Sequence, residues 1–307
     1  MARYLDPKND LTFKRIFAEH PKLLIKFLNA VMPFESGREI EKIEYLPAEM
    51  IPDNPTRKYS IVDVRCVDNE KRQFIVEMQM YWDGAFTNRL IFNAGKAYVR
   101  QLGRGYEYHR LQPVYTLAIL NEDFDRKTDR FYHHFQIVNR ENTDEVIPGL
   151  EFVLIELTEK FKPETLNDRK LAVLWLRFLK EVGENMSLLP PEMQENEDIR
   201  QAAEICEISA FTPEELAVYE KYWDMISTEK TLYKGAILKG EAIGEAIGIS
   251  KGEAIGLKKG EAIGREEEKK QFVINGYKKG HPIELISSFT ELTTEQIAEI
   301  LKQHGLI

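Results

Sequence analysis

The chain has 307 residues, of which 43% are hydrophobic, so it can bury a sizeable core and is expected to form more than one domain. Two cysteines, Cys66 and Cys206, exclude a disulfide framework and favour a reducing compartment. The sequence has no run of roughly 18 apolar residues and its start is unlike a signal peptide, so a cytoplasmic protein without a membrane partner is expected.

The net charge of −9 is confined to one half of the chain. Residues 1–150 hold 22 basic and 22 acidic side chains, whereas residues 151–307 hold 20 and 29. A strongly acidic surface would repel nucleic acid, and only the C-terminal half has that character. A DNA partner is therefore compatible with the N-terminal half.

Two short helices are predicted near the N-terminus, over residues 9–17 and from Pro21 to about residue 29. Asp10 lies in the first turn of the first helix, where a negative charge is favourable against the helix dipole. It becomes a third candidate metal ligand if this turn lies against the strands that follow. Residues 40–46 predict a weak strand.

The next two strands, residues 59–66 and 73–81, carry most of the chemical information. Each is an apolar run interrupted by charge, and residues 68–71 between them are typical of a tight turn. If residues 69–71 form the loop, Asp63 lies opposite Glu77 and points to the same face. Gln79 shares this face with Glu77, because side chains alternate along a strand.

Two carboxylates set across a β-ladder repel each other and destabilise it by up to about 1 kcal/mol. A divalent cation between Asp63 and Glu77 would turn this repulsion into attraction, and oxygen ligands of this kind suit Mg²⁺ or Mn²⁺. The alternative is that both acids lie on the solvated face of a half-buried hairpin.

A helix is predicted over residues 86–104, directly after this hairpin. Four cations fall within roughly 80° of one another around its axis, and we expect them to face outward. This stripe is either a solvated basic face or a row of DNA phosphate contacts. The four residues are Arg89, Lys96, Arg100 and Arg104.

Strands are predicted over residues 113–120, 131–138 and 152–157, and the pattern becomes helical from residue 167. His133 and His134 are expected to be structural, because neighbours in a strand point to opposite faces and cannot chelate one ion. Thr212 and Pro213 have the pattern of a helix start. Residues 160–235 show no pattern that suggests chemistry.

Glycine recurs at every fourth position from Gly240 to Gly264, with Glu-Ala-Ile between the glycines in several units. Seven glycines in one helix cost on the order of 7 kcal/mol relative to alanine, so this helix cannot be stable alone in water. The segment is either a flexible linker or a helix that associates closely with a copy of itself. The recurring isoleucines favour self-association and a homo-oligomer, since a spacer would not need them.

Three short helices are predicted at the end of the chain, over residues 266–276, 282–289 and 294–302. Their arrangement is similar to a helix-turn-helix unit. The last helix carries two Glu and one Lys, which is a poor composition for the major groove. An oligomerising or protein-binding role is the alternative to DNA binding.

Beyond these patterns, the chain resembles the PD-(D/E)xK nuclease-type transposases, also called the recombination-promoting nuclease (Rpn) family. The residues that carry the resemblance are the segment 8–17, the hairpin, the Arg89 to Tyr98 stretch and residues 102–119. The resemblance implies an α/β, restriction-endonuclease-like core with a mixed sheet flanked by helices, followed by an all-helical C-terminal half. We expect a nuclease core in residues 1–160, a helical extension in 161–235, a glycine-repeat stalk or linker in 236–265 and a small helical module in 266–307.

The resemblance also implies an activity: Mg²⁺- or Mn²⁺-dependent hydrolysis of DNA phosphodiesters that promotes recombination or transposition. Asp63 and Glu77 take the positions of the two metal-binding acids of the motif, and Gln79 takes the position of its lysine. Glutamine is neither a cation nor a base, so Gln79 can only orient a water or a phosphate oxygen. Arg89 and Lys14 are then the candidates for contacting the phosphate. The alternative is a catalytically weak protein of this fold that binds DNA or a partner through its tail.

Overall fold

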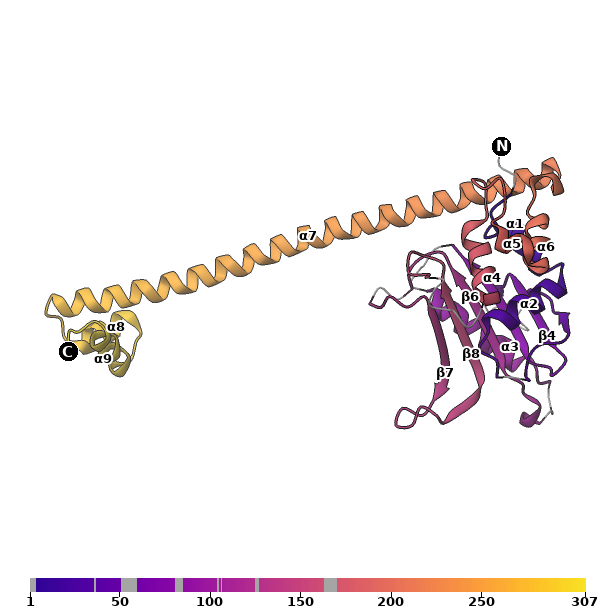
Figure 1. Ribbon diagram of the computed structural model, residues 1–307. Helices are drawn as coiled ribbons and strands as arrows, with labels where there is room; N and C mark the ends of the chain where they lie inside the picture. Colours follow the sequence, from indigo (N-terminus) through magenta and orange to yellow (C-terminus); the bar gives the residue numbers. More distant parts are fainter. Residues whose placement is uncertain are drawn as a thin grey trace. The chain divides into compact units, whose positions relative to one another are not determined.

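The computed structural model describes residues 4–35, 37–50, 60–80, 85–103, 105, 107–124, 127–162 and 170–307. It divides into two compact units, Met1–Lys230 and Thr231–Ile307. Helix α7, Pro213–Lys278, begins in the first unit and ends in the second (Figure 1). As the sequence predicts, Pro213 opens this helix, and the Thr212 hydroxyl accepts from the Glu215 N–H (3.2 Å).

A six-stranded mixed sheet forms the centre of the first unit, in the order β1-β4-β5-β6-β8-β7. β4 and β5 form an antiparallel hairpin, β6 is parallel to β5 and β8, and β7 is antiparallel to β8 at the edge. With its flanking helices, this sheet confirms the predicted fold class. The strands are β1 Ile43–Tyr45, β4 Val64–Asp68, β5 Gln73–Gln79, β6 Val114–Leu120, β7 Tyr132–Val138 and β8 Val146–Glu156.

One face of the sheet packs against a layer of several helices (Figure 1). The side chain of Trp175 is fully buried there, with ring centroids 5.8 Å from Phe17 and 5.5 Å from Phe27. Alternate residues of β5 and β6, such as Val76 and Leu117, contribute to the same core. The helices of this layer are α1 Asp10–Phe17, α2 Pro21–Val31, α4 Lys170–Glu181, α5 Pro191–Glu195 and α6 Glu197–Ile205.

The other face of the sheet packs against α3, Phe86–Val99. Leu90 and Ala94 of this helix are buried, the first beside Ala118 of β6 and the second beside Ile75 of β5. The hairpin and α3 therefore enclose the face on which Glu77 and Gln79 lie. The first unit also contains two 3₁₀ helices, Tyr108–Arg110 and Ile208–Ala210.

The predicted strand over residues 59–66 is wrong in its first half. β4 begins only at Val64, and Ser60–Ile61 forms a separate strand, β3, that pairs with β2, Glu49–Met50. The chain turns away from β5 before Asp63, and the Val62 N–H donates to the Ala48 carbonyl instead. Positions 59 and 81 of the predicted strands lie outside the described residues.

Two predicted helix boundaries are also wrong. The helix predicted over residues 86–104 ends at Val99, where the Arg100 N–H closes the last turn on the Lys96 carbonyl. Gly103 and Gly105 follow, and Gly105 has a left-handed backbone (φ +89°) that a helix cannot include. Residues 266–276 are the last turns of α7 and not a separate helix.

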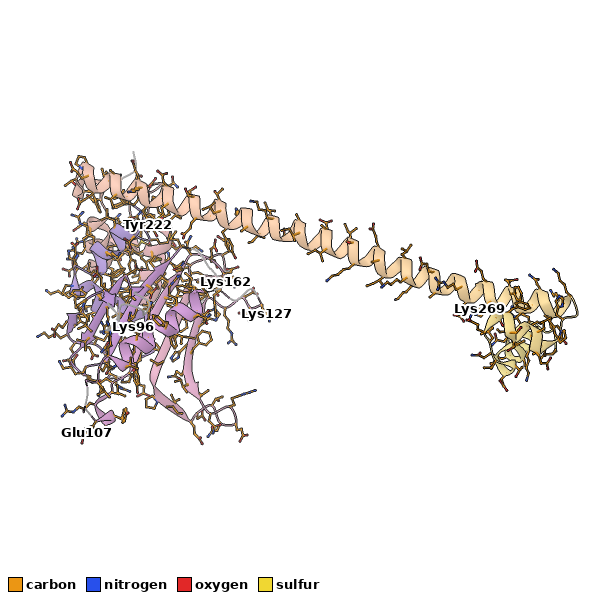
Figure 2. The ribbon with its side chains drawn as sticks, turned by 180° about the vertical axis from the view of Figure 1, so that it is seen from behind. Lys96, Glu107, Lys127, Lys162, Tyr222 and Lys269 are labelled. Atoms are coloured by element: carbon orange, nitrogen blue, oxygen red, sulfur yellow. The ribbon has the colours of Figure 1, made fainter. Side chains whose placement is uncertain are left out.

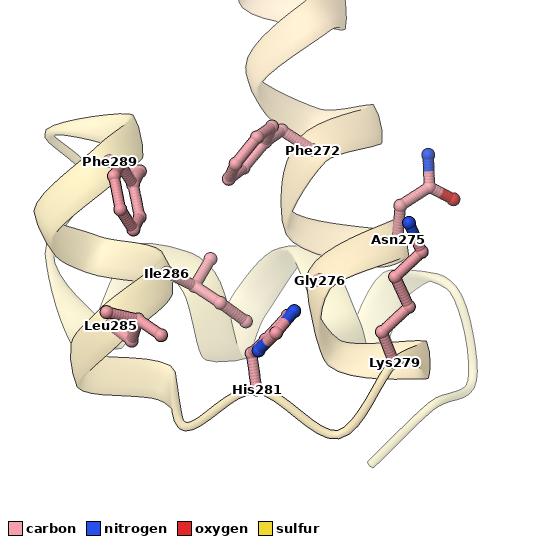
Figure 3. Close-up of a pocket in the computed structure, with 8 residues that line it drawn as sticks. All are labelled: Phe272, Asn275, Gly276, Lys279, His281, Leu285, Ile286 and Phe289. Carbon is pink, nitrogen blue, oxygen red and sulfur yellow. The ribbon is translucent and has the colours of Figure 1, made fainter.

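In the second unit, α8, Ile283–Thr290, and α9, Thr294–Gln303, pack against the end of α7. A capping box between Thr293 and Gln296 starts α9. Gly276 lets α7 approach α8 closely, because a Cβ there would lie 3.2 Å from Ile286 (Figure 3). Phe272 and Phe289 face each other beside Ile286 and keep part of their surface exposed (Figure 3).

The glycine repeat is helical throughout, as part of α7. Residues 236–268 are all exposed, and a Cβ placed on any glycine from Gly240 to Gly264 would meet no atom within 4 Å beyond its own helix. The side chains of this stretch project from the helix in Figure 2. Within the described part of the chain, no helix combines the length and apolar character that a bilayer crossing requires.

Candidate active site

Asp63 and Glu77 come together at the end of the β4–β5 hairpin. The register pairs Val64 with Val76, and Asp63 and Glu77 are the next residues beyond this pair on their two segments. Their charges interact, because the charge of Asp63 raises the pKa of Glu77. Because β4 starts only at Val64, the Met78 N–H donates to the Asp63 carboxylate, Oδ2, at 2.7 Å. The bend before β4 thus fixes the Asp63 side chain against the end of β5.

Glu77 is only 7% exposed, and its carboxyl group is hard to ionise. Burial is the main cause that raises its pKa to about 7, and the nearby charge of Asp63 raises it further. Asn93 of α3 works in the opposite direction, because its Nδ2 donates to Glu77 Oε1 at 3.0 Å and favours the ionised form. Arg89 also lowers this pKa through its charge.

Asp63 keeps part of its surface exposed, yet its pKa is raised to about 6. Burial is again the main cause, and the charge of Asp10 adds to it. The hydrogen bond from Met78 and the charges of Lys14 and Arg89 act in the other direction. The electrostatic environment of Asp63 therefore includes α1 and α3 as well as the hairpin.

Arg89 reaches the site from the first turn of α3. Its Nη2 donates to Gln79 Oε1 at 2.8 Å, and its guanidinium lies 5.1 Å from the centroid of the Phe86 ring. This contact fixes the orientation of the Gln79 amide, whose NH₂ group is the remaining donor. Arg89 therefore faces the acids and not the solvent-exposed side of the helix.

Asp10 and Lys14 lie one turn apart on α1 and form an ion pair, with Lys14 Nζ 2.7 Å from Asp10 Oδ1. Both side chains are partly exposed. Since the charge of each of them affects the pKa of Asp63, this part of α1 lies near the hairpin, although Asp10, Asp63 and Glu77 are not arranged as a three-acid metal group.

The other predicted phosphate contacts follow α3 away from the acids. Lys96 is half-buried, with its Nζ 5.6 Å from the centroid of the Phe92 ring of the same helix, and Arg100 lies at the C-terminal end of α3. Arg104 lies outside the described residues. A further arginine, Arg65 of β4, is buried near Arg100. Burial and the charge of Arg100 both lower the pKa of Arg65.

Asn93 is the residue of the site that the sequence patterns did not bring forward. It lies on the buried face of α3 with Leu90, Ala94 and Ala97, and its side chain is fully buried. A polar residue on an otherwise apolar helix face was the available signal, because such a position normally takes a hydrophobic side chain.

The donor set suits a hard divalent cation. Two carboxylates offer oxygen ligands, and Mg²⁺ commonly binds one or two carboxylates while it keeps several waters. Among the described residues, no group of three or more His, Cys, Asp or Glu side chains is arranged to hold a metal ion. His133 and His134 each contact a separate carboxylate, Glu156 at 2.8 Å and Glu151 at 3.0 Å.

The first unit thus has a mixed sheet flanked by helices, and the two arms of one hairpin bring two acids near each other. This combination defines a restriction-endonuclease-like core. The family of PD-(D/E)XK nuclease family transposases matches residues 7–232. The match covers most of the chain, and the protein therefore belongs to this family. No curated protein and no solved structure matches the chain.

The raised pKa of Glu77 predicts how stability depends on pH in metal-free buffer. The folded protein holds this proton more tightly than the unfolded chain, so the free energy of unfolding falls as pH rises from about 4.5 to about 7. The Glu77→Gln variant has no carboxyl group to ionise at this position and lacks this loss. Its free energy of unfolding relative to wild type should therefore rise by on the order of 3 kcal/mol between pH 4.5 and 8. Urea denaturation with a chelator measures the difference.

The matched control is Glu44→Gln, which changes an exposed acid on β1 of the same sheet. It removes an exposed carboxyl group and leaves Glu77 in place, so it provides the reference pH profile for the comparison. Parallel pH profiles for wild type and Glu77→Gln would contradict the buried, proton-retaining state of Glu77.

Proposed function

We propose that this nuclease-family protein is a metal-dependent DNA endonuclease whose cleavage promotes recombination or transposition. The observation that carries the proposal is the convergence of Asp63 and Glu77, two carboxyl groups that ionise with difficulty in the metal-free protein. A cation between them would stabilise both charged forms at once. Their burial then favours metal binding, because the ion supplies the charge that the apolar surroundings lack.

Asp63 and Glu77 would hold the ion, with Asp10 as a third candidate ligand from α1. A bound Mg²⁺ or Mn²⁺ supplies Lewis-acid polarisation of the phosphate and a lowered pKa for its water. Gln79, fixed by Arg89, has an amide positioned to orient a water or a phosphate oxygen. Arg89 and Lys14 provide positive charge where phosphate oxygens become more negative during cleavage.

Magnesium-dependent nicking of a supercoiled plasmid tests this function. Asp63→Ala removes one of the two carboxylates and should lower the rate at least about 100-fold, on the scale of losing a principal electrostatic contact. Glu44→Ala is the matched control on the same sheet and should cut like wild type. Equal nicking by wild type and Asp63→Ala would remove the enzyme hypothesis, because a contaminant would then explain the activity.

The basic residues along α3 support a path for the DNA backbone that leads to the acids. Arg89 lies at the site, while Lys96 and Arg100 follow about two and about three turns further along the helix. Arg104, which the sequence places on the same stripe of cations, is part of the same proposed path. Contacts of this kind position the backbone and carry no base specificity.

Charge reversal tests this path. The double variant Lys96→Glu and Arg100→Glu should bind DNA more weakly, and the slope of log K against log salt should become shallower by about 2, since each phosphate contact contributes about 0.9. Filter binding or fluorescence anisotropy across a salt series measures both quantities. An unchanged affinity at low salt would rule out phosphate binding by these two residues.

A second candidate function is a binding module that retains the fold but cuts poorly. The presence of Gln79 at the motif position of lysine favours it, as does the acidic C-terminal half. In that case the protein acts on DNA or on a partner through the end module in residues 266–307. The plasmid assay separates the two functions, because only the endonuclease loses activity with Asp63→Ala.

The exposed glycine repeat supports self-association as part of the proposal. The proposed domains are a nuclease core in 1–160, a helical extension in 161–235, a stalk in 236–265 and an end module in 266–307.

Both cysteines are buried free thiols, which supports a reducing, cytoplasmic setting.

Deletion of residues 236–265 tests the stalk. If the glycine helix pairs with a copy of itself, the shortened protein should be a monomer by light scattering, while the full chain has a multiple of the monomer mass. A control deletion of residues 279–307 keeps the repeat and should keep the oligomer. The same mass with and without the repeat would favour the linker.

A further inference from the structure

Asn93 occupies a position where folding alone would favour an apolar residue. Its side chain is fully buried on α3, between Leu90 and Ala97, which are also buried. Its Oδ1 has no hydrogen-bond partner among the residues that the structure describes, although the atom is shielded from solvent. An unsatisfied buried acceptor costs about 1–3 kcal/mol, and asparagine is a poor helix former.

The one hydrogen bond of this side chain is made to the candidate site, from Nδ2 to Glu77 Oε1 at 3.0 Å. The direction of the amide follows from the chemistry of the pair. An ionised carboxylate only accepts, so Oδ1 facing Glu77 would set two acceptors against each other, whereas Nδ2 donates. The orphaned Oδ1 is therefore the consequence of directing the donor at Glu77.

We propose that Asn93 is a positioning residue, which fixes the Glu77 carboxylate in the orientation that receives the divalent cation. This inference rests on the proposed function and adds to it the residue that prepares the metal ligand. Nδ2 occupies one lone pair of Oε1, so Oε2 and the second lone pair of Oε1 stay available for a cation. Hydrogen bonds that orient metal ligands in this way commonly contribute 10- to 100-fold in metal affinity.

The hydrogen bond from Asn93 to Glu77 is independent of the other hydrogen bonds of the site. Arg89 donates to Gln79, and the Met78 N–H donates to Asp63, so Asp63, Glu77 and Gln79 each have a donor of their own. α3 supplies two of these donors, and they lie four residues apart on one side of the helix. Loss of Asn93 should therefore affect Glu77 without releasing Asp63 or Gln79.

Isothermal titration of Mn²⁺ into the full-length, metal-free protein tests the proposal without depending on cleavage. The titration is run at pH 8.5 for wild type and variant alike, so that protons compete little with the metal for the carboxylates. Asn93→Leu keeps a side chain of similar size and removes the donor. Its dissociation constant for Mn²⁺ should rise between about 10- and 100-fold over wild type.

Leu90→Ala is the matched control, because it loosens the packing of α3 one turn away and touches none of the polar groups of the site. It should bind Mn²⁺ as wild type does. If Asn93→Leu does not give a folded protein by circular dichroism, Asn93→Ala takes its place in the same comparison.

Three results overturn the inference, and they are distinguishable. An unchanged Mn²⁺ affinity in the Asn93 variant shows that the hydrogen bond does not prepare the ligand. An equal loss in the Asn93 and Leu90 variants shows that only the packing of α3 matters. If wild type itself binds no Mn²⁺, the proposed metal-dependent function fails together with the inference.

Discussion

The burial of two carboxyl groups beside each other, at one end of a well-packed sheet, is the constraint on which the first unit depends. Burial raises the pKa of Asp63 and of Glu77, so the metal-free protein is less stable with these residues charged. Apolar residues at both positions would fold more readily. The hairpin, α1 and α3 form a frame that holds two unfavourable groups together, which is typical of a site kept for binding or chemistry.

The positive charge near these acids comes from helices and not from the strand that carries Glu77. Lys14 reaches Asp63 from α1, and Arg89 does so from α3, on the opposite face of the sheet. Both lower the pKa of Asp63 but do not outweigh its burial. Position 79, where the motif has a lysine, holds a glutamine that carries no charge. The glutamine at this position therefore does not leave the site without cations.

The parts of the fold that the sequence predicted well are those with a strong local signal. The apolar run of β6 and the Asn9-capped helix α1 follow directly from composition and spacing. The register of the hairpin followed from the length of one turn, in which Lys71 adopts a left-handed backbone, and this register brings the charge of Asp63 near Glu77. The break before Val64 could not be read from the sequence, because Ser60–Ile61 leaves the hairpin for a partner strand more than ten residues upstream. Asn93 was missed for a similar reason: its role depends on which strand residue faces α3, and this is a tertiary property.

The glycine helix raises a separate physical question, because nothing in its own unit covers residues 236–268. A repeat of four residues is longer than the 3.6 residues of a helical turn, so the glycines advance about 40° around the helix with each unit. Two helices that keep such a pattern in contact must wind around each other with a right-handed sense, opposite to a heptad coiled coil. Close contacts between helices through small residues also favour right-handed crossings. The four-residue period and the small residue therefore favour the same right-handed geometry for a pair of these helices. In such a pair, the absence of Cβ atoms would let the two backbones approach along a continuous path.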